Sequence, residues 1–279
     1  MSAETDAQRE VTRVALAGIA GAGFALAGSG AIREHGVSDR PTEDVDLFTP
    51  RQDSAEFGRA VERVVADLRG SGYEVEEVRR VEQFARLQVR TAEGLQLDVD
   101  LGVDWRANAP VRLDVGPVLS LEDAVGNKVS AVYSRGEPRD YLDLDAIRGS
   151  GRFTDEELVN AVAERDAGFE VSMFAQQLEA VHRVTLLDVE RYGITAEQLD
   201  GIKERCTRWA ADLRRESETT TAEAARPPGL HRSPLSASYP RAATEATRGG
   251  AEQSGVAPRR GGPYLPGRGY GGGGRGEGR

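Results

Sequence analysis

Cysteine, lysine and long apolar runs are all scarce in this chain of 279 residues. The single cysteine, Cys206, excludes a disulfide framework and any zinc site built from four cysteines. No stretch reaches the ~18 consecutive apolar residues that a membrane-spanning helix needs. The apolar segment 14–27 follows an acidic start, which is unlike the lead of a secretory signal. These absences predict a soluble, cytoplasmic protein with no membrane partner.

Positive charge is also in short supply, and it is unevenly distributed. The chain holds 36 Lys and Arg against 46 Asp and Glu, a formal net charge of -10. Residues 216–279 contain nine Arg, six Glu and no Lys or Asp, a net of +3, which leaves -13 for residues 1–215. Such an anionic part argues against a general, charge-driven nucleic-acid binder. Only Lys128 and Lys203 are lysines, so each is an unusual choice in this chain.

Composition and periodicity predict three regions along the chain. Residues 1–150 mix short apolar runs with helical spacings, which predicts an α/β domain. Residues 151–215 repeat apolar residues at helical spacing after Thr154, which predicts a helical domain. Residues 216–279 are rich in Ser, Thr, Ala and Pro and then in Gly and Arg, so we expect a disordered tail.

Within the first region, spacing and turn residues predict individual elements. Ser120, with Asp123 three residues on, is expected to begin one of the helices, and Glu93-Gly94 to mark a hairpin turn. The predicted strands are 24–27, 45–48, 73–78, 84–90 and 95–101, and the predicted helices are 31–35, 55–68 and 121–134.

A glycine-rich turn and a pair of aspartates form the first cluster with chemical potential. Gly28-Ser29-Gly30 lies where a helix is expected to begin, so its amides and the Ser29 hydroxyl suit phosphate oxygens. Asp44 and Asp46 follow on a predicted strand, and strand alternation directs both side chains to one face. Two adjacent carboxylates repel unless a cation lies between them, and Mg²⁺ prefers oxygen ligands.

Asp98 and Asp100 repeat this alternation on a later predicted strand, and the sequence leaves open which of them joins Asp44 and Asp46. Two or three carboxylates around Mg²⁺, beside a turn that holds phosphate, are the working parts of metal-assisted phosphoryl or nucleotidyl transfer. An Asp-x-Asp pair alone is common at strand ends, so it needs support from elsewhere in the chain.

The second cluster supplies that support and lies between Asn127 and Leu144. Lys128 and Arg135 are about two helical turns apart and share a face, and a compact ammonium suits a triphosphate. Arg139 and Asp143 have the i, i+4 spacing of an ordinary helical ion pair. Asp140 is then the better candidate to organise Lys128 or Arg135.

In this order, the two clusters resemble the AbiEii/AbiGii family of nucleotidyltransferases, which includes the toxin components of type IV toxin–antitoxin pairs. The resemblance covers roughly residues 20–215, and the Asn-Lys and Arg-Asp segments are its most specific part. A departure is Gly-Ser-Gly where many relatives have Gly-Gly-Thr or Gly-Gly-Ala. The matching stretches are Ala27-Gly-Ser-Gly-Ala31, Thr42-Glu-Asp-Val-Asp-Leu-Phe48, Val99-Asp-Leu-Gly-Val-Asp104, Asn127-Lys-Val-Ser-Ala-Val-Tyr-Ser-Arg135 and Arg139-Asp-Tyr-Leu-Asp-Leu144.

The resemblance implies an α+β fold: a polymerase-β-like nucleotidyltransferase domain, with a small mixed sheet flanked by helices, then an all-helical domain and the tail. It implies an NTP substrate and Mg²⁺, with Asp44, Asp46 and Asp100 (Asp98 as the alternative) at the metal. The catalytic residues would be these three with Lys128 and Asp140. The nucleotide-binding residues would be Gly28, Ser29, Lys128, Arg135, Arg139 and Asp143.

The acceptor stays open at this point. Similarity to enzymes that add nucleotides to tRNA 3′ ends favours tRNA, with a cognate antitoxin as a further partner, and Arg79, Arg80, Arg86 and Arg90 offer a basic patch for RNA. The net charge of residues 1–215 favours instead a small cationic acceptor such as an aminoglycoside, or a protein side chain. A non-enzymatic interaction protein is the third hypothesis, and it would have no affinity for NTP.

Overall fold

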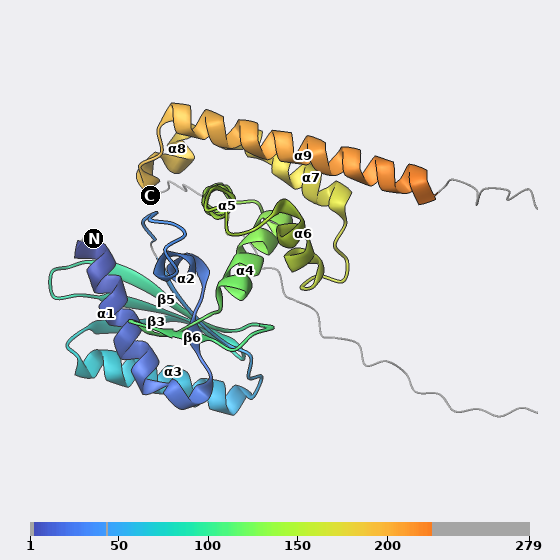
Figure 1. Cartoon of the computed structure of the whole chain (residues 1–279). Helices are drawn as coiled ribbons and strands as arrows, with labels where there is room; N and C mark the ends of the chain where they lie inside the picture. Colours follow the sequence, from blue (N-terminus) through green and yellow to red (C-terminus); the bar gives the residue numbers. More distant parts are fainter. Residues whose placement is uncertain (1–2, 43, 225–279) are drawn as a thin grey trace, which may run out of the picture. The chain divides into compact units, whose positions relative to one another are not determined.

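The computed structural model describes residues 3–42 and 44–224 (Figure 1). Of these, residues 3–42 and 44–222 belong to one compact unit. Its first part contains α1 (Ala3–Gly18), η1 (Ala20–Ala22), β1 (Ala25–Leu26), α2 (Gly28–Glu34), β2 (Asp44–Thr49), α3 (Ser54–Gly70), β3 (Glu74–Val81), β4 (Phe84–Arg90), β5 (Gln96–Val103), β6 (Val111–Leu113) and β7 (Gly116–Val118). The helices that follow are α4 (Leu121–Ser134), α5 (Pro138–Gly149), α6 (Asp155–Ala163), α7 (Val171–Glu179), η2 (Ala180–Arg183), α8 (Leu186–Val189), η3 (Glu190–Tyr192) and α9 (Ala196–Ala224).

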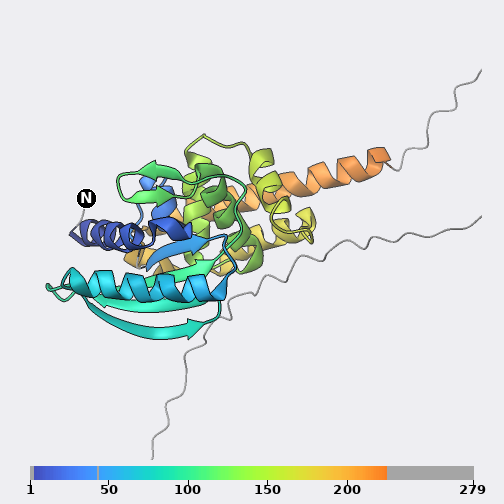
Figure 2. The same ribbon diagram turned by 90° about the horizontal axis from the view of Figure 1, so that it is seen from below.

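The strands form one mixed sheet in the order β3-β4-β5-β2-β1-β7-β6. β2 runs parallel to β5 and β1 runs parallel to β7, whereas the other neighbours are antiparallel. α1 and α3 pack together on one face of this sheet, which Figure 2 shows from below. The predicted mixed sheet flanked by helices is therefore confirmed.

Side-chain alternation gives the two faces of the central strands opposite characters. On β2, Val45 and Leu47 are buried in the apolar cluster that includes residues of α1 and α3. On the neighbouring β5, Val99 and Leu101 are buried in the same cluster. The residues between them therefore point to the other face, which we call the open face.

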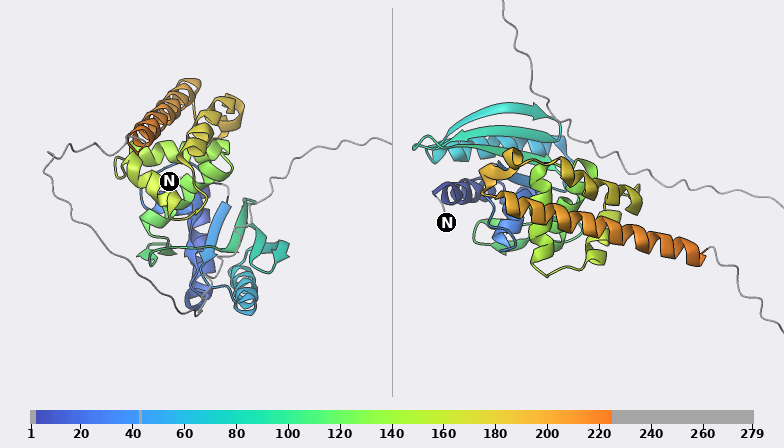
Figure 3. Two further views of the ribbon diagram at one scale, coloured as in Figure 1. Left: turned by 90° about the vertical axis from the view of Figure 1, so that its right-hand side faces the viewer. Right: turned by 90° about the horizontal axis from the view of Figure 1, so that it is seen from above.

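A second apolar cluster holds the helical part together. It begins at Val125 within α4 and extends to Leu213 on α9. The ring of Phe174 on α7 meets Trp209 on α9 edge-on, with 5.2 Å between their centroids, and Figure 3 shows α9 from above as it crosses this part. The second half of α4 and all of α5 thus pack with the helical region, although they lie before the predicted boundary at residue 150.

Some expected elements match the structure and others differ. The strand 84–90 and the helix 121–134 are confirmed, and Ser120 caps α4 by accepting from the amide of Asp123 at 3.1 Å. α2 begins at Gly28 rather than at residue 31, because Gly28 adopts a positive φ of 58° that turns the chain directly out of β1. The sequence patterns did not predict α1 or the β6–β7 hairpin.

The C-terminal region bears on two further expectations. α9 continues to Ala224, so the prediction of disorder from residue 216 onward is wrong for 216–224. Residues 225–279, the rest of the predicted tail, lie outside the described residues. Within the described part of the chain, no helix is both long and apolar enough to cross a membrane.

Candidate functional site

Four predicted carboxylates meet in two rows on the open face of the sheet. β2 and β5 are in parallel register, with Asp44 opposite Asp98 and Asp46 opposite Asp100. All four side chains alternate with the buried residues of their strands and so share the open face. The structure therefore brings both predicted Asp-x-Asp pairs together, although they are more than fifty residues apart in sequence.

Arg86 on β4 completes the row that holds Asp46 and Asp100. It lies opposite Asp100 in the antiparallel register of β4 and β5. Its Nε and Nη2 donate to the two carboxylate oxygens of Asp100 at 2.7 and 2.6 Å, whereas its Nη1 lies 4.0 Å from Asp98. Both oxygens of the expected third metal ligand are thus engaged by a guanidinium.

Asp46 lies against the glycine-rich turn. The backbone amide of Ala27 donates to the carbonyl oxygen of Asp46 at 2.8 Å, and a Cβ on Gly28 would overlap the Asp46 carboxylate. Burial and the neighbouring charge of Asp44 raise the pKa of Asp46 to about 7, and Lys128 only partly offsets them. Because a Cβ at position 28 would overlap this carboxylate, the close approach of the turn to Asp46 requires a glycine there.

A buried cluster of two cations, one carboxylate and one hydroxyl lies beside the turn. Lys128 Nζ is 2.7 Å from Ser29 Oγ and 2.8 Å from Asp143 Oδ2. Arg40 donates to both oxygens of Asp143 and, at 2.7 Å, to Ser29 Oγ. Ser29 itself donates to Asp143 at 2.9 Å. The Ser29 hydroxyl, expected to hold phosphate, is here fully used in positioning Lys128 and Arg40.

The charges of this cluster leave a positive surplus next to Asp46. Burial alone would raise the pKa of Asp143, but Lys128 and Arg40 outweigh burial and lower it to about 2. Asp143 is therefore ionised at neutral pH and balances one of the two cations. Arg40 was missed by the sequence analysis, because its partner Asp143 lies 103 positions away and no motif surrounds it.

The remaining residues of the second predicted cluster form two separate contacts. Asp140 is fully buried and accepts from Nε and Nη2 of Arg135, both at 2.9 Å, so it organises Arg135 and not Lys128. Arg139 reaches across to β2, where its Nη1 lies 3.4 Å from Asp44. The interpretation of Arg139 and Asp143 as a helical ion pair is wrong, because each pairs with a residue of another element.

The donor set on β2 fits a hard divalent cation. Asp44 and Asp46 share one face, and the raised pKa of Asp46 marks a carboxyl group whose ionised form a dication would stabilise. Within residues 3–42 and 44–224, no three His, Cys, Asp or Glu side chains already gather closely enough to hold a metal ion. Asp100, the expected third carboxylate ligand, is paired with Arg86 here, and this ion pair occupies both of its oxygens.

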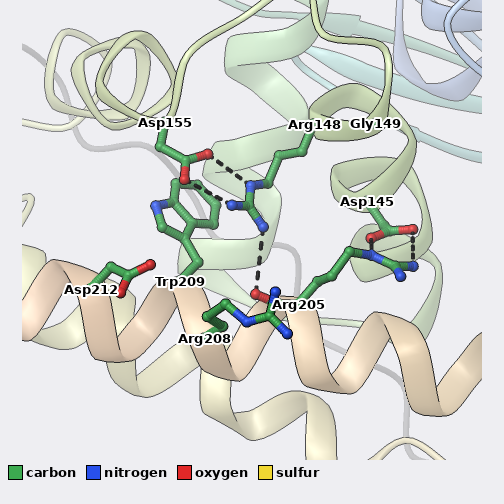
Figure 4. Close-up of a pocket in the computed structure, with 8 residues that line it drawn as sticks. All are labelled: Asp145, Arg148, Gly149, Asp155, Arg205, Arg208, Trp209 and Asp212. Carbon is green, nitrogen blue, oxygen red and sulfur yellow. Dashed lines mark hydrogen bonds and ion pairs between the residues drawn. The ribbon is translucent and has the colours of Figure 1, made fainter.

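A separate pocket of about 480 Å³ lies among α5, α6 and α9 (Figure 4) and shares no residue with this site. Its charged side chains already pair across it: Arg148 with Asp155, and Arg205 with Asp145. The Arg148 guanidinium also lies 4.4 Å from the centroid of the Trp209 ring. These contacts join α5 to both α6 and α9 and are structural.

Comparison with known proteins places the site in context. Residues 15–194 match the family described as "Nucleotidyl transferase AbiEii toxin, Type IV TA system", a range that includes both clusters. The fold is similar to that of MenT4, a nucleotidyltransferase toxin from Mycobacterium tuberculosis H37Rv, at 17% identity and a TM-score of 0.50, over 79% of this chain and 93% of that chain. JHP933 from Helicobacter pylori is 16% identical over 80% of this chain and 99% of that chain, with a TM-score of 0.46. No curated protein matches this chain in sequence.

Proposed function

The chain belongs to the AbiEii family of nucleotidyltransferases from type IV toxin–antitoxin systems, and from this premise we propose that it moves a nucleoside monophosphate from an NTP to the 3′ end of a tRNA, with Mg²⁺ as cofactor. Nucleotidyl transfer itself follows from the family. The observation that carries the finer proposal is the row of Asp46 and Asp100, which has Lys128 on the β1 side and Arg86 on the β4 side.

Asp44 and Asp46 are the residues that would hold the cation. Bound there, Mg²⁺ would stabilise the negative charge that develops at the α-phosphate and lower the pKa of the acceptor hydroxyl. Arg139 lies 3.4 Å from Asp44 and 3.0 Å from Glu137, so Arg139 is the side chain that would leave Asp44 for phosphate when nucleotide binds.

The buried cluster at the turn supplies the fixed positive charge for the triphosphate. Lys128 and Arg40 are both held by Ser29 and Asp143, and their side chains are only 8% exposed. Because these partners fix their positions, little side-chain entropy remains to be lost on binding. Arg135 is oriented in the same way by Asp140, but 46% of its side chain is exposed and accessible to ligand.

The acceptor hydroxyl approaches from the β4 side of the carboxylate row. Its oxygen bonds to the α-phosphorus while the bond from that phosphorus to the bridging oxygen breaks, and pyrophosphate leaves. Asp100 is the carboxylate of this row nearest that side, and Arg86 orients it through hydrogen bonds to both of its oxygens. Family membership also supports a cognate antitoxin as a protein partner of the folded chain.

Transfer of label from NTP labelled at the α-phosphate tests the proposal. We expect the wild-type protein to label total tRNA in the presence of Mg²⁺ and the Asp46→Ala variant to transfer none while it keeps its circular dichroism spectrum. Asp114→Ala is the matched control, because Asp114 is 89% exposed and outside the carboxylate row. Label on an aminoglycoside or on protein, with none on tRNA, would show that tRNA is not the acceptor. The net charge of residues 1–215 would then explain the preference for an acceptor other than RNA.

A further inference from the structure

A third row follows the carboxylates on the open face of the sheet. Gly102 on β5 lies opposite Phe48 on β2 and opposite Phe84 on β4. On each of the three strands, the residue of this third row is two positions from the residue of the row that holds Asp46, Asp100 and Arg86. Two positions along a strand are a step of roughly 6.6 Å. Two aromatic rings therefore lie within one nucleotide's length of the carboxylates.

Gly102 allows the two rings to converge. A Cβ at this position would lie 3.2 Å from two atoms of the Phe48 ring and 3.9 Å from the Phe84 ring. Both phenylalanines are half-buried, whereas the apolar residues of the opposite face, such as Leu47 and Leu101, are fully buried. The rings therefore form an accessible apolar floor next to charged groups, a site of the kind on which bases stack.

Arg79 adds an uncompensated positive charge at the edge of this floor. A register shift between Glu77 and Arg79 turns Arg79 to the open face, opposite Arg86. Its guanidinium lies 5.7 Å from the centroid of the Phe84 ring, and among the described residues it has no carboxylate partner. Arg86 opposite it is already paired with Asp100, so Arg79 is the one of these two cations that is left to bind an anion.

The structure also divides the basic patch expected from the sequence. Arg80 points to the α3 side, where it donates to the carbonyl oxygen of Gly58 at 2.7 Å. Arg90 is on the open face, but it pairs with Glu74 at 3.5 Å. Of the four arginines, Arg79 alone combines the open face with a charge that no carboxylate neutralises.

We propose that Phe48, Phe84 and Arg79 bind the last nucleotides of a single-stranded RNA acceptor, with a base stacked on the rings and a backbone phosphate on Arg79. This inference rests on the proposed function, because the floor is placed against the same carboxylate row. The floor serves the acceptor and not the NTP, since the cations held for the triphosphate, Lys128 and Arg40, contact Ser29 in the turn that follows β1. Arg79 and Phe84 lie instead on β3 and β4, at the far end of the strand order.

Fluorescence anisotropy with a labelled, single-stranded oligoribonucleotide tests binding without any transfer reaction. Phe84→Ala is expected to weaken binding roughly tenfold, the typical effect of one lost base stack. Phe84→Trp should retain the affinity of the wild type and Phe84→Leu should not, which separates stacking from simple apolar burial. Arg79→Gln should reduce the slope of log affinity against log salt by about 0.7, the value for one phosphate contact on a single strand, whereas the control Arg80→Gln should leave it unchanged.

Steady-state transfer then distinguishes this inference from the proposed function. Phe84→Ala should raise the KM for the RNA acceptor and leave the KM for NTP unchanged. An increase in the KM for NTP instead, equal oligonucleotide affinities for Phe84→Ala and wild type, or no oligonucleotide binding by the wild type would each overturn the inference. Absence of transfer to any acceptor by a wild-type protein that binds the oligonucleotide would refute the proposed function alone.

Discussion

Replacement of Lys128 by methionine removes one cation from the buried cluster while it keeps a side chain of similar length. Lys128 is held by Asp143 at 2.8 Å and by Ser29 at 2.7 Å, and only 8% of its side chain is exposed. Lys203 is the other lysine of the chain, so Lys203→Met provides a control of the same chemical change elsewhere.

The expected loss of stability follows from the burial of both partners. Removal of one member of a buried ion pair typically costs 3–5 kcal/mol, because the other charge is left without its partner. Arg40 still contacts both oxygens of Asp143 in the variant, which favours the lower end, about 3 kcal/mol. For a unit of this size the midpoint of thermal unfolding should fall by roughly 6–12 °C.

The pH dependence of this loss has a defined sign. The pKa of Asp143 is about 2 in the folded protein and lies below its value in the unfolded chain. The corresponding stabilisation is complete at neutral pH and is lost as the pH falls through about 4 to 2. Without Lys128 the pKa of Asp143 is less depressed, so the stability difference between wild type and Lys128→Met should shrink on acidification from pH 7 to pH 3.

Urea unfolding at these two pH values, followed by circular dichroism, measures the difference directly. The double variant Lys128→Met/Asp143→Leu should be less stable than Lys128→Met, because it leaves the buried guanidinium of Arg40 without its carboxylate partner. If Lys128→Met costs no more than Lys203→Met, or if the difference is the same at pH 7 and pH 3, the buried pairing described above is refuted.

Two further substitutions address the carboxylate row and the turn. Because the folded protein binds the proton of Asp46 more tightly than the unfolded chain does, the ionisation of Asp46 costs stability as the pH rises from about 4 to 7. Asp46→Asn should therefore stabilise the metal-free protein by up to about 4 kcal/mol at pH 8 and by less than half as much at pH 5, as urea unfolding in EDTA would show. Gly28→Ala should lose most of the transfer activity in the assay with NTP labelled at the α-phosphate, because its Cβ would overlap the Asp46 carboxylate. Gly36→Ala is the control, since Gly36 also has a positive φ, of 68°, but has open space for a Cβ. Equal losses of activity in both variants would contradict the requirement for close approach at position 28.

The local patterns predicted the parts of the site that depend on neighbours in sequence. Strand alternation was enough to give Asp44 and Asp46 a common face, and the capping residues were enough to place α4, with Lys128 on it. The sequence also predicted the turn at Glu93-Gly94, but it did not predict how many residues form the loop between the two strands. A two-residue loop would pair Arg86 with Leu101, whereas the observed register pairs it with Asp100. Because a slip of one residue moves a side chain to the other face, the Arg86 contact could not be derived from the turn alone.

The parts that were missed depend on long-range packing. Arg40 lies in the segment between α2 and β2, where no sequence pattern points to Asp143, and its role appears only when α5 brings Asp143 next to Ser29. The same packing separates Arg139 from Asp143, because contacts with other elements outweigh the few tenths of a kcal/mol of an exposed helical pair. Sequence spacing alone assigned that pair wrongly.

Calorimetric titration of the wild-type protein with each NTP, in the presence and absence of Mg²⁺, measures directly whether the Asp44–Asp46 face and the Lys128 cluster form a single nucleotide site. We expect at least one NTP to bind with an affinity that depends on Mg²⁺, that is largely lost in Asp46→Ala and that is unchanged in Asp114→Ala. No NTP binding by the wild type in Mg²⁺, or equal binding by Asp46→Ala, would contradict the nucleotide site proposed for this chain.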